Sequence, residues 1–249
     1  TSQRGPKEMN YLDLVNNVLA RLREEKANKT SLDSNPYYAV IGAAVNDAKT
    51  TVEDAWSWSA LRTTKDVQVT KGESVVRIPG SKENCFKIEH VLNANSGFFL
   101  RPEPLQVIQR QYANDFISPR GPAQPSTYGF HQNFWNENDD TDENNGLQQI
   151  RLGSPADAFT NLVVHCYGGQ GPLTGALQQM RVPAAPVYLL ATAIASRERG
   201  ETGGIMVNEL FMLAKTSLAD AIAIDTARFP EEMIWTSPGD AAQTNWATS

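Results

Sequence analysis

The sequence is poor in the residues that most often mark a chemical site. Among its 249 residues, only two are cysteine and only three are histidine: Cys85, Cys166, His90, His131 and His165. Two cysteines exclude a disulfide framework, so free thiols are expected. No histidine has a metal-ligating residue three or four positions away, whereas zinc needs three or four ligands. We therefore expect no metal and no cofactor.

Positive charge is also scarce. Lys and Arg number 22 against 28 Asp and Glu, which gives a net charge of −6. A general DNA-binding surface would carry a basic excess, so this balance argues against one. No apolar stretch reaches the roughly 18 residues that a membrane-spanning helix needs. The polar first ten residues do not have the pattern of a signal peptide. Neither DNA nor a membrane is an expected binding partner.

Catalytic motifs are missing as well. The glycine-rich stretch 168–175 lacks the Lys-Ser/Thr that ends a P-loop, and Thr174 stands where a dinucleotide fingerprint needs its third glycine. We interpret this stretch as a loop. There is no Gly-x-Ser-x-Gly elbow and no kinase or deaminase signature. Together with the few histidines, these absences predict no catalytic residue and a protein that is not an enzyme.

An acidic, asparagine-rich loop is predicted at 132–145, inside a stretch without Lys or Arg that runs from Arg120 to Arg151. A calcium-binding EF-hand register beginning at Asp140 would put Asn145 at the required glycine and Arg151 at the required glutamate, so that motif is broken. A solvated loop, or a negative surface facing a partner or a channel, is expected. Its acids are Glu137, Asp139, Asp140, Asp142 and Glu143.

Apolar spacing predicts four long helices. Steps of three and four residues indicate helices at 8–25 and 36–56, with Asn35-Pro36 as the start of the second. Two further helices are predicted at 186–199 and 205–228, where Pro230 stops the last one. One short helix is expected at 104–114.

Alternating apolar and polar residues predict strands in the middle of the chain. A hairpin is expected around Gly72, and the other strands at 86–91, 98–100, 126–130, 147–152 and 161–167. We predict an α+β fold: a bundle of long helices, an N-terminal pair plus a C-terminal pair, with a central antiparallel β module. The expected domains are a helical one from 1–60 and 183–228, and a β-rich one from 61–182.

The residues 229–249 are predicted to form an extended C-terminal arm. They are too polar to build a core of their own, yet aromatic side chains are costly to leave in water. We therefore expect an interface with a neighbouring molecule, or else a tail folded back on its own domain. The expected interface residues are Met233, Ile234, Trp235 and Trp246.

The order of several short motifs resembles one family, the head-to-tail adaptor proteins of tailed bacteriophages, in particular the tail tubular protein A type of short-tailed phages. The resemblance covers about residues 9 to 235. It is carried by Met9-Asn10-Tyr11-Leu12-Asp13-Leu14-Val15-Asn16, Val45-Asn46-Asp47-Ala48, Trp56, Trp58, Leu61-Arg62, Ile78-Pro79-Gly80, Gln109-Arg110-Gln111-Tyr112 and the proline-rich Gly121-Pro122-Ala123-Gln124-Pro125-Ser126-Thr127-Tyr128. The long acidic loop at 136–145 and the tail at 234–249 depart from the family pattern.

The resemblance implies a structural virion protein of the phage neck, made in the host cytoplasm. Such a protein joins the portal protein to the tail nozzle protein as a homo-oligomeric ring, typically of twelve subunits, through heterologous contacts. DNA passes through the lumen during genome ejection without specific binding, and a net charge of −6 suits such a channel.

Two alternatives remain open at the level of sequence. One is another tail-completion or nozzle protein of the same assembly. The other is a small hydrolase with an unrecognised site, which would show a pocket with convergent ionisable groups, whereas a ring protein would show extended interfaces.

Overall fold

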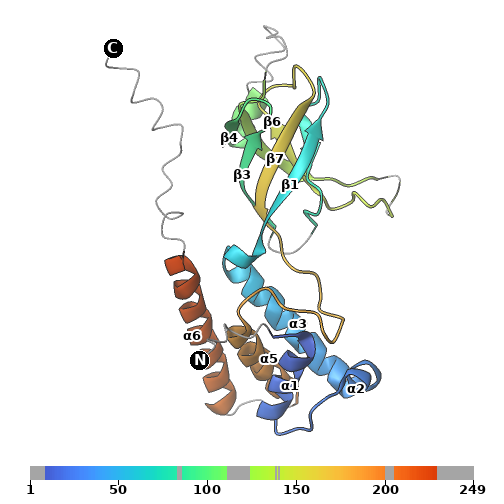
Figure 1. The fold of residues 1–249 in the computed structure, drawn as a ribbon, viewed down its shortest axis with the longest axis vertical. Helices are drawn as coiled ribbons and strands as arrows, with labels where there is room; N and C mark the ends of the chain where they lie inside the picture. The colour runs from blue at the N-terminus through green and yellow to red at the C-terminus, as the bar shows by residue number, and fades with distance from the viewer. Residues whose placement is uncertain are drawn as a thin grey trace, which may run out of the picture. The chain divides into compact units, whose positions relative to one another are not determined.

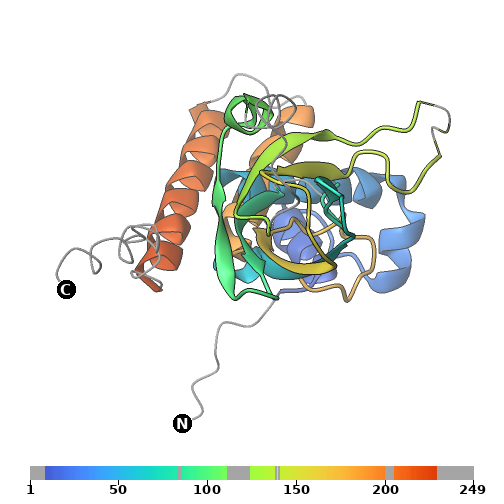
Figure 2. The ribbon, with the colours of Figure 1, turned by 90° about the horizontal axis from the view of Figure 1, so that it is seen from above.

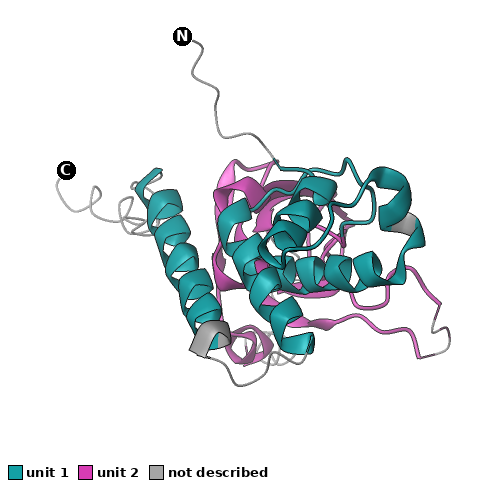
Figure 3. Ribbon diagram, turned by 90° about the horizontal axis from the view of Figure 1, so that it is seen from below, with its two compact units in different colours: residues 1–52, 173–249 teal, residues 53–172 magenta. Residues whose placement is uncertain are grey.

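The computed structural model describes residues 9–82, 86–110, 124–137, 139, 141–199 and 205–228. The chain divides into two compact units, shown in teal and magenta in Figure 3. The first, helical unit combines residues 1–52 with 173–249, and the second unit, residues 53–172, is built on a β-sheet.

The helices of the first unit are labelled in Figure 1. They are α1 (Tyr11–Arg21), α2 (Lys29–Ser34), α3 (Pro36–Ala55), α5 (Ala184–Glu198) and α6 (Ile205–Arg228). Asparagine side chains cap the N-termini of α1 and α2. The side chain of Asn10 accepts a hydrogen bond from the amide of Asp13, and the side chain of Asn28 accepts one from the amide of Ser31. The start of α3 is likewise marked by Asn35, whose side chain accepts from the amide of Tyr37.

The core of the helical unit joins parts of the chain that are far apart in sequence. The apolar face of α1 is fully buried at Leu14, Val15, Val18 and Leu19, and α1 packs against α5. The Asn46 side chain donates to the carbonyl of Leu173 and accepts from its amide, at 3.1 and 2.8 Å. Nearby, the amides of Tyr11 and Leu12 donate to Gln178 and Ala176. These bonds tie the segment after residue 173 to the N-terminal helices.

Within the described residues, seven strands form one sheet in the order β1-β7-β3-β4-β5-β6-β2. All neighbours are antiparallel except β4 and β5, which are parallel, so the sheet is mixed. The end strands β1 and β2 approach each other, and the sheet nearly closes on itself. The strands are β1 (Arg62–Val69), β2 (Val75–Arg77), β3 (Lys87–Asn93), β4 (Phe98–Pro102), β5 (Thr127–Asn133), β6 (Gln148–Leu152) and β7 (Thr160–Tyr167).

Apolar and polar residues alternate along the strands, so that apolar side chains fill the inside of this sheet. In β7, Leu162, Val164 and Cys166 are fully buried while the residues between them are more exposed. They pack with residues from the other strands, among them Val69, Ile78, Val91, Leu100, Ile150 and Leu152. Cys166 is a buried free thiol, and Cys85 lies outside the described residues.

The predicted fold class is wrong in its architecture. The protein is α+β, but its β part is a nearly closed, mixed seven-stranded sheet within the described chain, rather than a central antiparallel module inside a bundle of long helices. The error arose because alternation locates strands without showing their partners. Around Gly72 the sequence predicts a hairpin, yet β1 pairs with β7 and β2 pairs with β6. Both pairings join segments that are distant in sequence.

Helix boundaries also differ from the predicted ones. The first helix ends at Arg21, and Arg23 takes a left-handed conformation with φ of 60°, which stops it before residue 25. The short α2 was not predicted. The helix expected at 104–114 is present at 105–110, and residues 111–114 lie outside the described part.

Candidate functional site

The nearly closed sheet has an opening between β3 and β5. The strand between them, β4, pairs with β3 only through residues 98–100. It pairs with β5 only where Arg101 and Pro102 face Thr127 and Tyr128. Because β4 ends at Pro102, no described strand lies between the first residues of β3 and the second half of β5. We call this region the wall opening.

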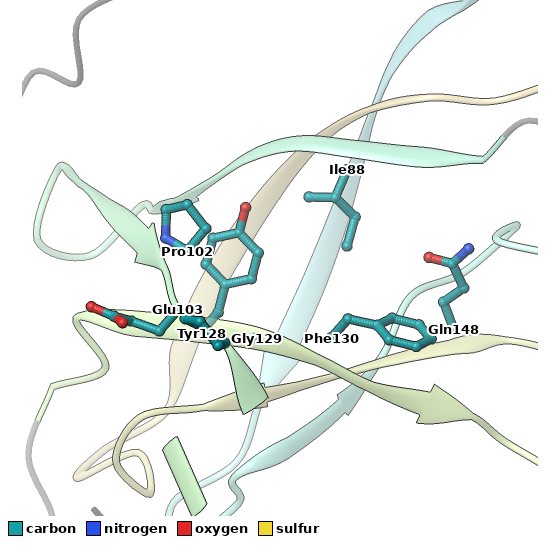
Figure 4. A pocket seen from close by; sticks show the side chains of 8 residues that line it. Ile88, Pro102, Glu103, Tyr128, Gly129, Phe130 and Gln148 are labelled. Atoms are coloured by element: carbon teal, nitrogen blue, oxygen red, sulfur yellow. The ribbon is translucent and has the colours of Figure 1, made fainter. Parts of the chain in front are cut away.

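The wall opening contains a pocket of about 460 Å³. Figure 4 shows Tyr128 beside Pro102 at one end and Phe130 directed toward Gln148 at the other. The Gln148 side-chain amide donates a long hydrogen bond of 3.5 Å to the carbonyl of Phe86, which links β6 to the residue before β3. The lining residues are Ile88, Pro102, Glu103, Pro104, Tyr128, Gly129, Phe130 and Gln148.

Two β-bulges flank the opening. The pairing of β3 with β7 shifts register between Ile88 and His90, and the pairing of β5 with β6 shifts between Phe130 and Gln132. A bulge bends its strand and increases the local twist. Bends in both bordering strands account for their separation where β4 ends.

One glycine fixes the position of the helix beside the opening. A Cβ atom on Gly129 would lie 2.6 Å from the carbonyl oxygen of Glu103 and 2.8 Å from Cδ1 of Ile108. The backbone of β5 therefore touches the helix 105–110 directly, and Ile108 is fully buried. This contact needs a residue without a side chain.

The chemistry of the pocket favours binding of apolar groups. Burial raises the pKa of Tyr128, so its phenol stays neutral under ordinary conditions. The carboxylate of Glu103 is 3.1 Å from the guanidinium of Arg101. The remaining lining is aliphatic, aromatic or amide, so the pocket holds no nucleophile with an adjacent base.

A pair of stacked histidines lies on the sheet outside this pocket. The rings of His90 and His165 are 4.4 Å apart, and Phe99 meets His90 edge-on at 4.9 Å. Burial, followed by the neighbouring His165, lowers the pKa of His90. Arg62 lowers it further, whereas Glu89 acts in the opposite direction. In the described part of the chain, no group of three or more His, Cys, Asp or Glu is placed to hold a metal ion.

The acidic loop between β5 and β6 extends far from the sheet, as the yellow-green segment in Figure 2 shows. Its described residues are ordered by polar contacts. Asp142 accepts hydrogen bonds from the amide of Asn144 and the side chain of Asn136, at 2.8 and 3.0 Å, and these bonds hold its pKa below the ordinary value. The side chain of Asn145 accepts from the amide of Asn136. The sequence predicted a solvated loop, or a negative surface facing a partner or a channel, and gave no sign of this network.

The helix α6 has a large apolar surface exposed to solvent. It packs against α5, yet among its residues 208–228 only Ala214 is buried. Met212, Leu213 and Ile224 are 62%, 50% and 56% exposed. An apolar helix of this kind is normally covered on all sides.

The predicted interface residues Met233, Ile234, Trp235 and Trp246 lie outside the described residues. The glycine-rich stretch is a connection after β7, where the amide of Gly168 donates to the carbonyl of Leu61. Sequence reasoning missed the wall opening, although the Pro102-Glu103-Pro104 stop and Gly129 inside a strand are signals that could have suggested it.

No protein-family model matches the chain, and no curated protein matches it. In the described residues, no helix combines the length and apolar character needed to cross a bilayer. The fold thus defines an α+β protein with a helical unit and a nearly closed sheet unit.

Proposed function

We propose that this protein is a structural ring subunit, the head-to-tail adaptor between the portal and the tail nozzle of a short-tailed bacteriophage. The observation that carries the proposal is the exposed face of α6. A 24-residue helix with one buried residue among the 21 at 208–228 leaves extensive apolar surface in water. A neighbouring subunit would cover this surface.

The spacing on that face suits contact with another helix. Met212, Thr216, Ala219 and Ala223 are all exposed and follow each other at intervals of four, three and four residues. At 100° per residue, these positions form one stripe on the side opposite Ala214. Small side chains allow a second helix to approach closely. We infer that a helix of the next subunit packs along this stripe, and that repeated heterologous contacts close the ring.

The ring proposal is consistent with the other properties of the chain. The negative net charge suits a channel that passes DNA without holding its phosphates. The pocket of the sheet unit lacks the paired ionisable groups that a hydrolase would need. The portal and nozzle proteins are the proposed partners, and the resemblance of the sequence motifs is the reason for naming them.

The test is assembly of the full chain with the portal protein of the same phage, measured by light scattering. The unchanged protein should form a large complex in this mixture, even if it is monomeric alone. The double substitution Met212→Glu and Ala223→Glu should abolish that complex, because two charges would enter the contact. Leu177→Glu is the matched control, since Leu177 is 71% exposed and lies outside α6.

A strictly monomeric protein in the presence of the portal would contradict the adaptor assignment. Assembly with a nozzle protein but not with the portal would favour a tail-completion protein instead. Circular dichroism of each variant shows whether the fold is retained, so that loss of assembly can be assigned to the contact.

A further inference from the structure

We propose that the wall opening between β3 and β5 is a docking site for the C-terminal segment 229–249 of a second copy of this chain. In this arrangement Ile234 and Trp235 enter the pocket lined by Tyr128 and Phe130. The inference rests on the proposed function, because a ring brings the segment of one copy close to its neighbour.

The first argument is the incomplete sheet. Over Lys87–Glu89, β3 has β7 on one side and no described strand on the other. The second half of β5 likewise pairs only with β6. Such edges offer backbone N–H and C=O groups to an incoming extended chain. The open stretch of β3 is three residues long, or about 10 Å, which suits a short segment.

The second argument is the character of the pocket. Its volume of about 460 Å³ falls in the range of roughly 300–1,000 Å³ that is usual for binding pockets. Phe130, which lines the pocket, is 53% exposed although it is a large aromatic residue. Proline and aromatic surfaces favour aromatic and aliphatic side chains. The segment supplies three consecutive ones, Met233-Ile234-Trp235.

The third argument is charge complementarity. Arg101, adjacent to the lining residue Pro102, has a side chain that is 75% exposed, and the exposed Lys87 is adjacent to Ile88. The segment contains no Lys or Arg after Arg228 and carries Glu231 and Glu232 directly before Met233. Acidic residues beside an apolar anchor would face Lys87, whereas Arg101 is already paired with the lining residue Glu103 at 3.1 Å.

The length of the segment also permits docking on another copy. From Arg228 to the end of the chain there are 21 residues, which can extend at most about 70 Å. Ile234 is six residues beyond α6, so it can reach about 20 Å from the end of that helix.

The binding test uses the full chain with Ile234→Ser and Trp235→Ser, which leaves the pocket intact and removes the competing anchors. A fluorescent peptide of residues 229–249 should bind this protein saturably. Adding Phe130→Ser should weaken binding at least tenfold. Adding Phe159→Ser is the matched control and should change binding less than twofold, because Phe159 is equally exposed, at 55%, and does not line the pocket.

A second experiment tests whether the segment comes from another copy. Isotope-labelled Phe130→Ser protein, which has the segment but a damaged pocket, is mixed with unlabelled Ile234→Ser/Trp235→Ser protein. Chemical cross-links should join residues 229–249 of the labelled copy to the β3 and β5 region of the unlabelled copy. In unchanged protein assembled with the portal, cross-links of this kind should also join different copies.

The proposal is overturned if the peptide does not bind, if both phenylalanine substitutions have the same effect, or if unchanged protein assembled with the portal cross-links only within one copy. The charge substitutions on α6 separate this result from the ring proposal. They should abolish assembly and leave peptide binding unchanged. Peptide binding without assembly on the portal would therefore refute the adaptor function alone, and assembly without peptide binding would refute only the docking site.

Discussion

At the residue scale, the absence of a side chain at Gly129 allows a close backbone contact. It lets β5 touch the helix 105–110, which borders the pocket. The surroundings of His90 also change its chemistry, since burial and the neighbouring His165 disfavour its charged form. Each of these features gives a prediction that concerns a single position.

Substituting Gly129 by valine should destabilise the protein. The new side chain would overlap the carbonyl of Glu103 and the end of Ile108, a clash that we expect to cost about 1–3 kcal/mol. The thermal midpoint should fall by several degrees. Gly171→Ala is a suitable control, because a Cβ at that position meets nothing within 4 Å. Equal midpoints for the two variants would show that the close approach is not present.

The stability of the protein should decrease in mild acid in a manner that depends on His90. Its pKa is lowered in the folded state, so the unfolded chain binds the proton more readily. The contribution of His90 to stability is therefore fully present above a pH of about 6.5, the ordinary pKa of histidine. It is lost as the pH falls below that value toward the lower pKa of the folded state. Thermal midpoints measured across this range should show a smaller decrease for His90→Phe than for unchanged protein. An identical decrease would exclude His90 as the cause.

At the scale of elements, local pattern and tertiary contact act on the same helices and loops. Gly42 lies within α3, where alanine would ordinarily be the better helix former by about 1 kcal/mol. A Cβ on Gly42, however, would collide with the hydroxyl of Tyr11 on α1. The contact between the two helices outweighs the helix propensity at this position.

We therefore expect Gly42→Ala to lower the free energy of unfolding, in spite of its higher helix propensity. Adding Tyr11→Phe removes the hydroxyl and should restore most of the loss. Urea denaturation of the single and double variants measures this coupling. An increase in stability for Gly42→Ala alone would mean that α1 and α3 are farther apart than the structure indicates.

The acidic loop should be dispensable for folding. It has no apolar residue from 136 to 145, and the hydrogen bonds to Asp142 come from Asn136 and Asn144 within the loop itself. Replacing Asp139, Asp140, Asp142 and Glu143 by serine should leave the thermal midpoint nearly unchanged. A fall of more than about 5 °C, of the order of 1 kcal/mol or more, would indicate that the loop packs on the sheet or binds an ion.

At the scale of the whole molecule, the two units differ in how the chain builds them. Residues 53–172 are continuous and contain the whole sheet with its own apolar core. The helical unit combines two separate stretches, and the apolar face of α1 needs α5 for its burial. Independent folding is therefore expected of the sheet unit and not of either helical stretch alone.

A protein of residues 53–172 should fold on its own. Circular dichroism and dispersed amide resonances would demonstrate it, along with a cooperative thermal transition. Residues 1–52 alone should remain largely unfolded, because α1, α2 and α3 would lack the partners supplied after residue 173. An unfolded 53–172 fragment would show that the sheet depends on contacts outside its own unit.

The sequence by itself determined where most helices and strands lie, because periods of 3.6 and two residues are local properties. Helices occur at the four positions where apolar spacing predicts them, although α1 ends at Arg21 and is shorter than predicted, and β7 alternates as its sequence indicates. Capping residues such as Asn35 also act over a few positions, so the start of α3 was readable. The composition suggested a protein without an evident catalytic site.

Only the tertiary structure decided which strands pair and which apolar surfaces remain uncovered. Arg62 faces Tyr167 across a sequence separation of 105 residues, and no local pattern specifies that partner. The wall opening exists because β4 is short and two bulges bend its neighbours, which becomes visible only after the sheet has formed. Likewise, the apolar residues of α6 are spread around the helix and not gathered on one side, so its sequence cannot indicate which side α5 covers. The pairing of strands and the burial of apolar surfaces depend on the simultaneous packing of distant segments. The periodicity of apolar residues depends only on neighbours along the chain.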